Sequence, residues 1–179
     1  MSSRKAILEA IRSNLPAPTS LPENRALTGQ QGELDEFLRN IRINGGDVVV
    51  CDTEEAFNTY RAATPQAPSA GEPAAWDQLG QIWLEGGIAV AENGAVWIAE
   101  TQLLHRILPF ICAHLVLGIR ASTLVPDMQE AYARLSLSGE APGYGAFIAG
   151  PSKTADIEQS LVIGAHGPLQ HTVVIWKDA

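Results

Sequence analysis

Residues 34–51 read LDEFLRNIRINGGDVVVC and predict a helix that two glycines join to a strand. Apolar side chains recur at three- and four-residue steps from Leu34 to Ile41, which is the spacing of one helical face, so a helix is expected over about 32–43. Gly45 and Gly46 supply its C-terminal cap. The β-branched run 47–51 is typical of a strand buried on both faces, and the two elements together form an α/β unit.

Helices and strands alternate along the rest of the chain. Asn93-Gly94 lies between the apolar runs 87–92 and 95–99 and predicts a tight β-hairpin with Glu92 at its bend. Further strands are expected at 115–119, 146–149, 161–164 and 171–176, and further helices at about 53–62, 103–111, 127–137 and 155–159. This alternation predicts an α/β fold whose mainly parallel sheet is covered on both faces, with one antiparallel hairpin.

The first 28 residues differ from the rest. Ile7, Leu8, Ile11 and Leu15 predict an amphipathic helix, and the proline-containing stretch 16–28 predicts an extended connector. We therefore expect a helical arm and connector over 1–28 and a single α/β domain over 29–179, a length that buries most of its unfolded surface.

Composition excludes several classes of function. The net charge of −8 argues against binding bare nucleic acid or an anionic membrane, since both require a basic footprint. No apolar run is long enough to span a bilayer and no signal-peptide stretch follows Met1, so a cytoplasmic protein is expected. Only Cys51 and Cys112 occur, each beside aliphatic residues, and two thiols cannot hold a four-thiolate iron–sulfur cluster or a structural zinc.

The best candidate ligand site is the turn Gly150-Pro-Ser-Lys-Thr154, predicted to join a strand to a helix. Its glycine lets the backbone approach a ligand, Ser152 and Thr154 offer hydroxyls, and Lys153 offers a positive charge. With the free amides of the helix that is expected next, these groups suit a phosphate or a carboxylate. The alternative is that a hydroxyl merely caps the helix and Lys153 is solvated.

Three further polar residues are candidates for the same site. Asp156 is a possible ligand contact, although an acidic residue in a first helical turn also suits the helix dipole. His166, in a second glycine turn, could serve as proton donor or anion contact, or could simply bond the backbone. Glu92 is placed for general base work, or is solvated. The four histidines lack metal-ligand spacing, so no metal site is expected.

The nineteen residues from Gly150 to Pro168 resemble the C-terminal signature of the LUD domain family, in its lactate utilization protein C type. Residues 88–98 and the opening helix at 7–12 are similar to other segments of that family. Two features depart from the pattern. The family usually has Glu-Thr-Gly-Thr where this chain has Glu92-Asn-Gly-Ala95, and residues 64–87 form a short segment.

The resemblance implies a three-layer α/β/α sandwich, like that of phosphosugar isomerases and CoA transferases. It also implies a non-redox subunit of a complex that oxidises L-lactate to pyruvate, with no cofactor in this chain and with iron–sulfur clusters in the partner subunits. Gly150, Ser152, Lys153, Thr154, Asp156, His166 and Glu92 would then line a crevice for a small carboxylate or phosphate. Two alternatives stay open: a stand-alone isomerase or CoA-transferase-like enzyme with Glu92 as base or nucleophile, and a binding module without catalysis.

Overall fold

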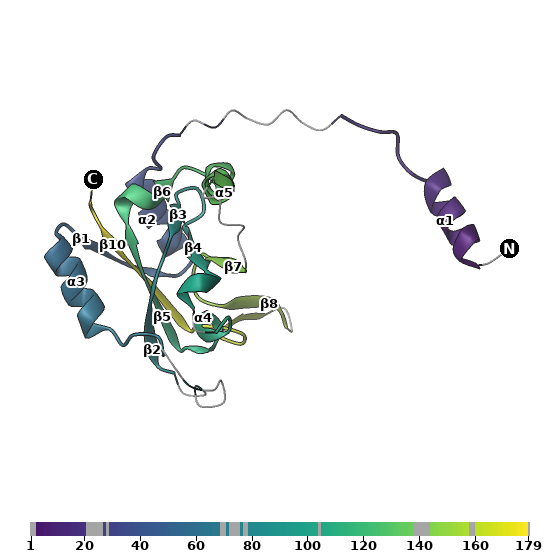
Figure 1. The fold of residues 1–179 in the computed structure, drawn as a ribbon. Coiled ribbons are helices and arrows are strands. Elements are labelled where there is room, and N and C mark those ends of the chain that lie inside the picture. The colour runs from purple at the N-terminus through teal and green to yellow at the C-terminus, as the bar shows by residue number, and fades with distance from the viewer. Residues whose placement is uncertain are drawn as a thin grey trace.

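The structure is a computed structural model (Figure 1). It describes residues 3–20, 27, 29–68, 71, 76, 79–103, 105–137, 144–157 and 160–178. No helix within these ranges is both long and apolar enough to cross a bilayer.

The centre of the fold is a parallel sheet of four strands in the order β1-β10-β5-β2. These are β1 (Asp47–Cys51), β10 (Gln170–Trp176), β5 (His114–Arg120) and β2 (Gln81–Glu85). Successive side chains of β10 point to opposite faces: Val173 and Ile175 enter one core, and Val174 enters another. The continuous apolar run of β10 follows from this double burial.

A second sheet of four strands is mixed, in the order β6-β3-β4-β7. β3 (Ile88–Val90) pairs with β6 (Leu124–Val125) in parallel and with β4 (Ala95–Ala99) in the antiparallel sense, and β4 pairs with β7 (Gly145–Ile148) in the antiparallel sense. β8 (Lys153–Ile157) and β9 (Ser160–Ile163) form a separate two-stranded hairpin, which projects from the rest of the domain (Figure 1).

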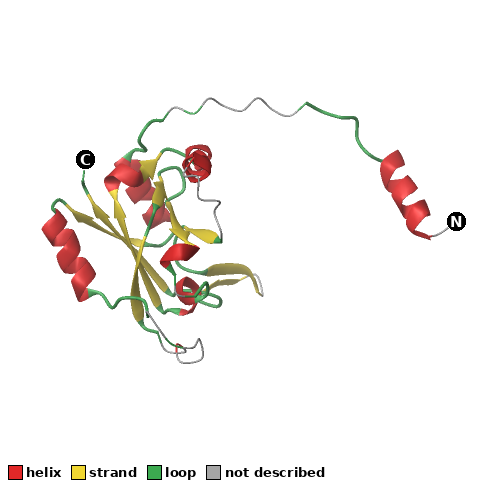
Figure 2. Ribbon diagram, viewed as in Figure 1, coloured by secondary structure: helices red, strands yellow, loops and turns green. Residues whose placement is uncertain are grey.

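The helices cover the sheets in layers (Figure 2). α3 (Glu54–Ala63) packs Phe57 on one face of the parallel sheet. The other face is covered by α2 (Leu34–Ile43), by α4 (Leu108–Ile111) and by the second sheet. α5 (Met128–Leu137) packs Ala131 on the outer side of the second sheet. The predicted α/β sandwich with a mostly parallel sheet is confirmed.

Several local predictions are confirmed. α2 ends at Ile43 with Asn44 as its C-cap, and Gly45 follows with φ +81°, a left-handed conformation that favours glycine. Thr53 caps α3 by accepting the Ala56 N–H. The hairpin at Glu92 is present, but Val90 pairs with Ala95, so its loop has four residues, 91–94.

Three expectations are wrong. No helix occupies 155–157, because this segment is part of β8: pairing with the nearby strand β9 bonds backbone groups that a one-turn helix would leave free. The helix expected over 103–111 is limited to α4, because Pro109 is tolerated only in a first turn. β1 is less buried than expected: it lies at the edge of the sheet, Val48 and Val49 pack only half-buried against the two cores, and Val50 is 36% exposed.

The N-terminal helix α1 (Ser3–Ser13) forms as predicted and buries none of its residues. Figure 1 shows it well away from the two sheets. The division of the chain into 1–28 and 29–179 stays a prediction.

Candidate functional site

The predicted turn at Gly150 lies between β7 and β8 and packs against the C-terminal end of α2. Gly150 has φ +134°, and a Cβ atom there would lie 2.9 Å from the backbone oxygen of Asn44. Both the conformation and the close approach require glycine. The glycine therefore serves helix packing at this point.

Lys153 also lies over the end of α2. A Cβ atom built on Gly45 would be 3.2 Å from Lys153 Nζ. The last carbonyls of a helix carry the negative end of its dipole, so they favour a lysine ammonium group. Since β8 replaces the expected helix, this turn also lacks the helix amides on which the predicted anion cradle depended.

The structure brings the Gly150 and His166 turns together, while their sharing of a ligand crevice stays a prediction. Ser152 N–H donates to Pro168 O at 2.9 Å, and Gly164 N–H donates to Ser152 O at 3.0 Å. His166 is exposed in its turn, and Thr154 is half-buried in β8. The side chain of Asp156 lies outside the described part of the chain.

Glu92 caps a helix. The Met128 N–H at the start of α5 donates to Glu92 Oε1 at 2.9 Å. An acidic side chain at a helix N-terminus is stabilised by the free amides and the helix dipole. The neighbouring Asn93 O accepts a hydrogen bond of 2.8 Å from Asn44 Nδ2, so the end of α2 contacts both the Glu92 loop and the Gly150 turn.

A second candidate place is a pocket of about 460 Å³ at the carboxyl ends of β2, β5 and β10, which we call the carboxyl-edge pocket. Ligands of open parallel α/β sheets bind at this end of the strands. The polar and aromatic side chains that line it come from α3, from the strand ends and from the residues after β5. They are Glu54, Phe57, Asn58, Arg61, Glu85, Arg120, Thr123 and Trp176.

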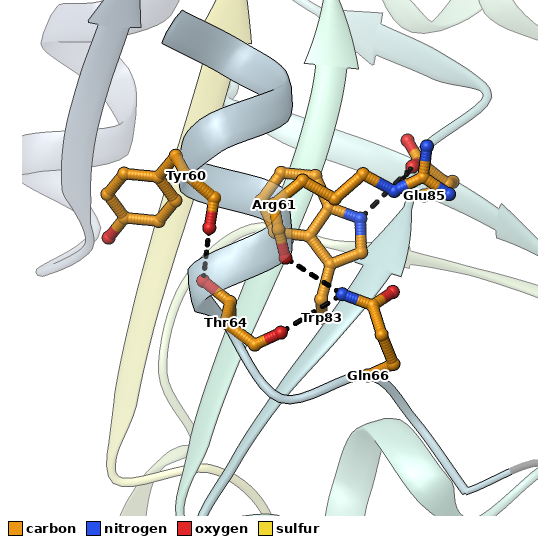
Figure 3. Close-up of polar contacts among 6 residues, drawn as sticks. All are labelled: Tyr60, Arg61, Thr64, Gln66, Trp83 and Glu85. Atoms are coloured by element: carbon orange, nitrogen blue, oxygen red, sulfur yellow. Dashed lines mark hydrogen bonds and ion pairs between the residues drawn. The ribbon is translucent and has the colours of Figure 1, made fainter.

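Arg61 and Glu85 form one wall of the carboxyl-edge pocket (Figure 3). Arg61 Nε lies 3.0 Å from Glu85 Oε1, and the buried Trp83 donates its Nε1–H to the same oxygen at 3.1 Å. Gln66 Nε2 donates to the backbone oxygens of Arg61 and Thr64 at 2.9 and 3.0 Å, which ties the end of α3 to the following loop. Glu85 is thus held in place by two donors from different elements.

Arg120 and Trp176 form the opposite wall. They are direct partners in the register of β5 and β10, and the Arg120 guanidinium carbon lies 5.3 Å from the Trp176 ring centroid. Within the described ranges no carboxylate forms an ion pair with Arg120. A guanidinium fixed on an aromatic ring keeps its N–H groups for a planar, bidentate partner such as a carboxylate.

Sequence reasoning missed these residues, although a signal existed. Glu85, Arg120 and Trp176 are the last residues of three parallel strands, where an apolar run ends in a polar or aromatic residue. The rule that ligands bind at carboxyl ends of strands applies to each of them. Arg61 gave no such signal, since it is one of several exposed charges on α3.

Comparison with known proteins gives the family. Residues 84–176 match the LUD domain, and the chain is 36% identical to the Lactate utilization protein C of Geobacillus sp. (strain WCH70), over 98% of this chain and 80% of that protein. The chain belongs to the LUD domain family. The region matched to the LUD domain contains Glu85, Arg120 and Trp176, together with both predicted glycine turns.

Other relatives of this LUD domain chain match over shorter stretches. The Lactate utilization protein C of Anoxybacillus flavithermus is 36% identical over 56% of this chain and 44% of its own length. That of Bacillus pumilus is 39% identical over 50% of this chain and 39% of its own length. In both cases the aligned region spans less than half of the relative.

A solved structure shares the fold. The crystal structure of a DUF162 family protein from Deinococcus radiodurans superposes with a TM-score of 0.57 at 14% identity, covering 80% of this chain and 95% of that one. At this identity the likeness shows the fold alone.

Proposed function

We propose that this LUD domain protein acts in lactate utilization, as a cytoplasmic non-redox subunit that binds a small anion beside iron–sulfur subunits that oxidise L-lactate. One observation carries the proposal: the 36% identity to a Lactate utilization protein C over 98% of this chain. The redox step belongs to the partner subunits, and this chain assists it by binding substrate or by docking.

The chemistry of the two cysteines supports this division of labour. Cys51 and Cys112 are both buried and unpaired. Burial raises the pKa of the Cys112 thiol to about 11, and burial together with the neighbouring Asp52 raises the pKa of Cys51. Metal binding requires the thiolate, which a raised pKa disfavours.

The position of Glu92 favours assistance over catalysis by this chain alone. In an isomerase or a CoA transferase Glu92 would have to meet a substrate as base or nucleophile. Its Oε1 instead accepts the N–H of Met128 and caps α5. We therefore prefer the non-redox subunit to the stand-alone enzyme.

Growth on L-lactate tests the proposal. A strain that lacks this protein should fail to grow with L-lactate as sole carbon source, should grow normally on glucose, and should recover when the full chain is supplied. Iron–sulfur proteins should copurify with the tagged full chain from lactate-grown cells. Normal growth of the deletion strain on lactate would contradict the proposal.

A further inference from the structure

We propose that the carboxyl-edge pocket is the ligand site of this protein and that it takes a small 2-hydroxy or 2-oxo monocarboxylate, whose carboxylate lies on Arg120. The proposal deepens the proposed function, on which it rests, by naming the site and the class of ligand. The ligand site then lies at the carboxyl end of the parallel sheet, opposite the two glycine turns, which lie at its amino end.

Arg120 is the anchor because it is held beside Trp176 and forms no ion pair with a described residue. The Asp178 carboxylate lies close enough to interact with its charge, but both carboxylate oxygens already accept hydrogen bonds from Ser122. Strand pairing sets its backbone beside Trp176, and the ring of Trp176 lies 5.3 Å from its guanidinium carbon. A cation–π contact uses the positive charge of the guanidinium and forms no hydrogen bond to its N–H groups, which can donate to a ligand. No described side chain forms an ion pair with it, so a ligand carboxylate can supply the bidentate partner.

The charges around the pocket favour one negative charge on the ligand. Arg61 is already paired with Glu85, and Glu54 adds a further carboxylate to the lining. A phosphate dianion would be attracted to Arg120 but repelled by Glu54 and Glu85, whereas a monocarboxylate can turn its uncharged end toward them. The pocket therefore selects a carboxylate over a phosphate.

The size and the remaining polar groups fit such a ligand. A volume of about 460 Å³ lies in the range of small-molecule sites, which leaves room for a three-carbon acid together with ordered water. The Asn58 amide can donate to a hydroxyl or carbonyl oxygen at C2 of the ligand. The Thr123 hydroxyl donates to Arg120 O at 2.7 Å, so its oxygen can only accept, from a ligand hydroxyl. Phe57 and Ile119 supply apolar walls.

The Gly150 turn is the weaker candidate because Lys153 lies beside the C-terminal end of α2. Its Nζ would be 3.2 Å from a Cβ atom on Gly45, next to helix carbonyls that favour a positive charge. This contrast gives a matched pair of variants, Arg120→Gln and Lys153→Gln. Each removes one exposed cation and leaves the same shorter, uncharged polar side chain.

Calorimetric titration of the full chain with L-lactate, pyruvate and inorganic phosphate tests the site. We expect lactate or pyruvate to bind more tightly than phosphate, Arg120→Gln to weaken carboxylate binding about tenfold or more, and Lys153→Gln to leave it within about twofold. Arg120→Lys should recover only part of the affinity, since an ammonium lacks the planar fork. A melting temperature for each variant verifies that it folds.

Three outcomes would overturn the inference. If Lys153→Gln abolishes carboxylate binding and Arg120→Gln does not, the site is the Gly150 turn and the proposed function stands. If phosphate binds more tightly than both acids, the ligand class is wrong. If neither lactate nor pyruvate binds the wild type, but growth on lactate still depends on the protein, only this inference fails. If growth on lactate does not depend on the protein either, the proposed function fails as well.

Discussion

At the amino ends of β1, β10 and β5 the parallel sheet is sealed by close packing, whereas at the carboxyl ends of β2, β5 and β10 it opens into a charged pocket. At the sealed end, Gly46 lies so close to His171 that a Cβ atom would be 2.9 Å from its Nδ1, and His171 is only 1% exposed. At the open end, the last residues include the exposed Arg120 and the half-exposed Glu85.

The two ends therefore divide stability and binding between them. Substitutions in close-packed, buried surroundings cost folding free energy, because cavities, overlaps and buried charges cannot relax. Exposed charges contribute little to folding, because water and salt screen them. The amino end should thus be sensitive to changes that the carboxyl end tolerates, while loss of ligand binding should follow changes at the carboxyl end.

Lowering the pH should destabilise the fold through His171, which is buried at the sealed end. Burial, with a smaller contribution from His114, lowers the pKa of His171 from 6.5 to about 4. Between these pH values the unfolded chain holds a proton that the folded chain excludes, so stability falls as pH falls from 6.5 toward 4. The shift corresponds to about 3 kcal/mol of unfolding free energy, measurable by urea denaturation across that range.

Two histidine variants isolate this effect. His171→Gln removes the buried titration and should flatten the fall in stability between pH 6.5 and 4, even if the variant is less stable throughout. His166→Gln, at an exposed position, is the matched control for the loss of an imidazole side chain. An unchanged slope in His171→Gln would show that other groups cause the acid sensitivity.

Substitution of the closely packed Gly46 should cause the next largest loss of unfolding free energy. Gly46→Ala places a methyl group 2.9 Å from both His171 Nδ1 and Ile41 Cγ2, so it should destabilise the fold by about 2 kcal/mol through overpacking. Gly80, at the same end of the sheet, has nothing within 4 Å of an added Cβ atom. Gly80→Ala should be close to neutral in the same unfolding experiment, and equal losses in both variants would contradict a sealed amino end.

The sequence predicted those elements whose pattern is local. The apolar spacing of α2, its glycine cap, the continuous run of β5 and the Asn-Gly hairpin signal all depend on neighbours in the chain. The β8–β9 hairpin was missed because a short segment such as Lys153–Ile157 takes the structure that its pairing partner allows. The edge position of β1 was missed because strand order is a property of the whole sheet.

The candidate site was harder to predict for the same reason. The position of both glycine turns at strand ends suggested that they face one crevice; the structure shows hydrogen bonds between the two turns, and the crevice stays a prediction. The position of Lys153 over Gly45 depends on a helix more than a hundred residues earlier, which no local pattern marks. The carboxyl-edge pocket required the order of four strands to be known, since only that order brings Arg61, Arg120 and Glu85 to one place.

The smallest change in stability is expected at the open end. Arg120→Gln removes a cation–π contact at an exposed position, which contributes about 0.5–1 kcal/mol, and breaks no ion pair with any described residue. Its unfolding free energy should therefore stay within about 1 kcal/mol of the wild type, although the same variant should lose carboxylate binding. If Arg120→Gln lost as much unfolding free energy as Gly46→Ala, the carboxyl end would also be needed for folding stability. The weaker binding of Arg120→Gln would then no longer identify a ligand contact.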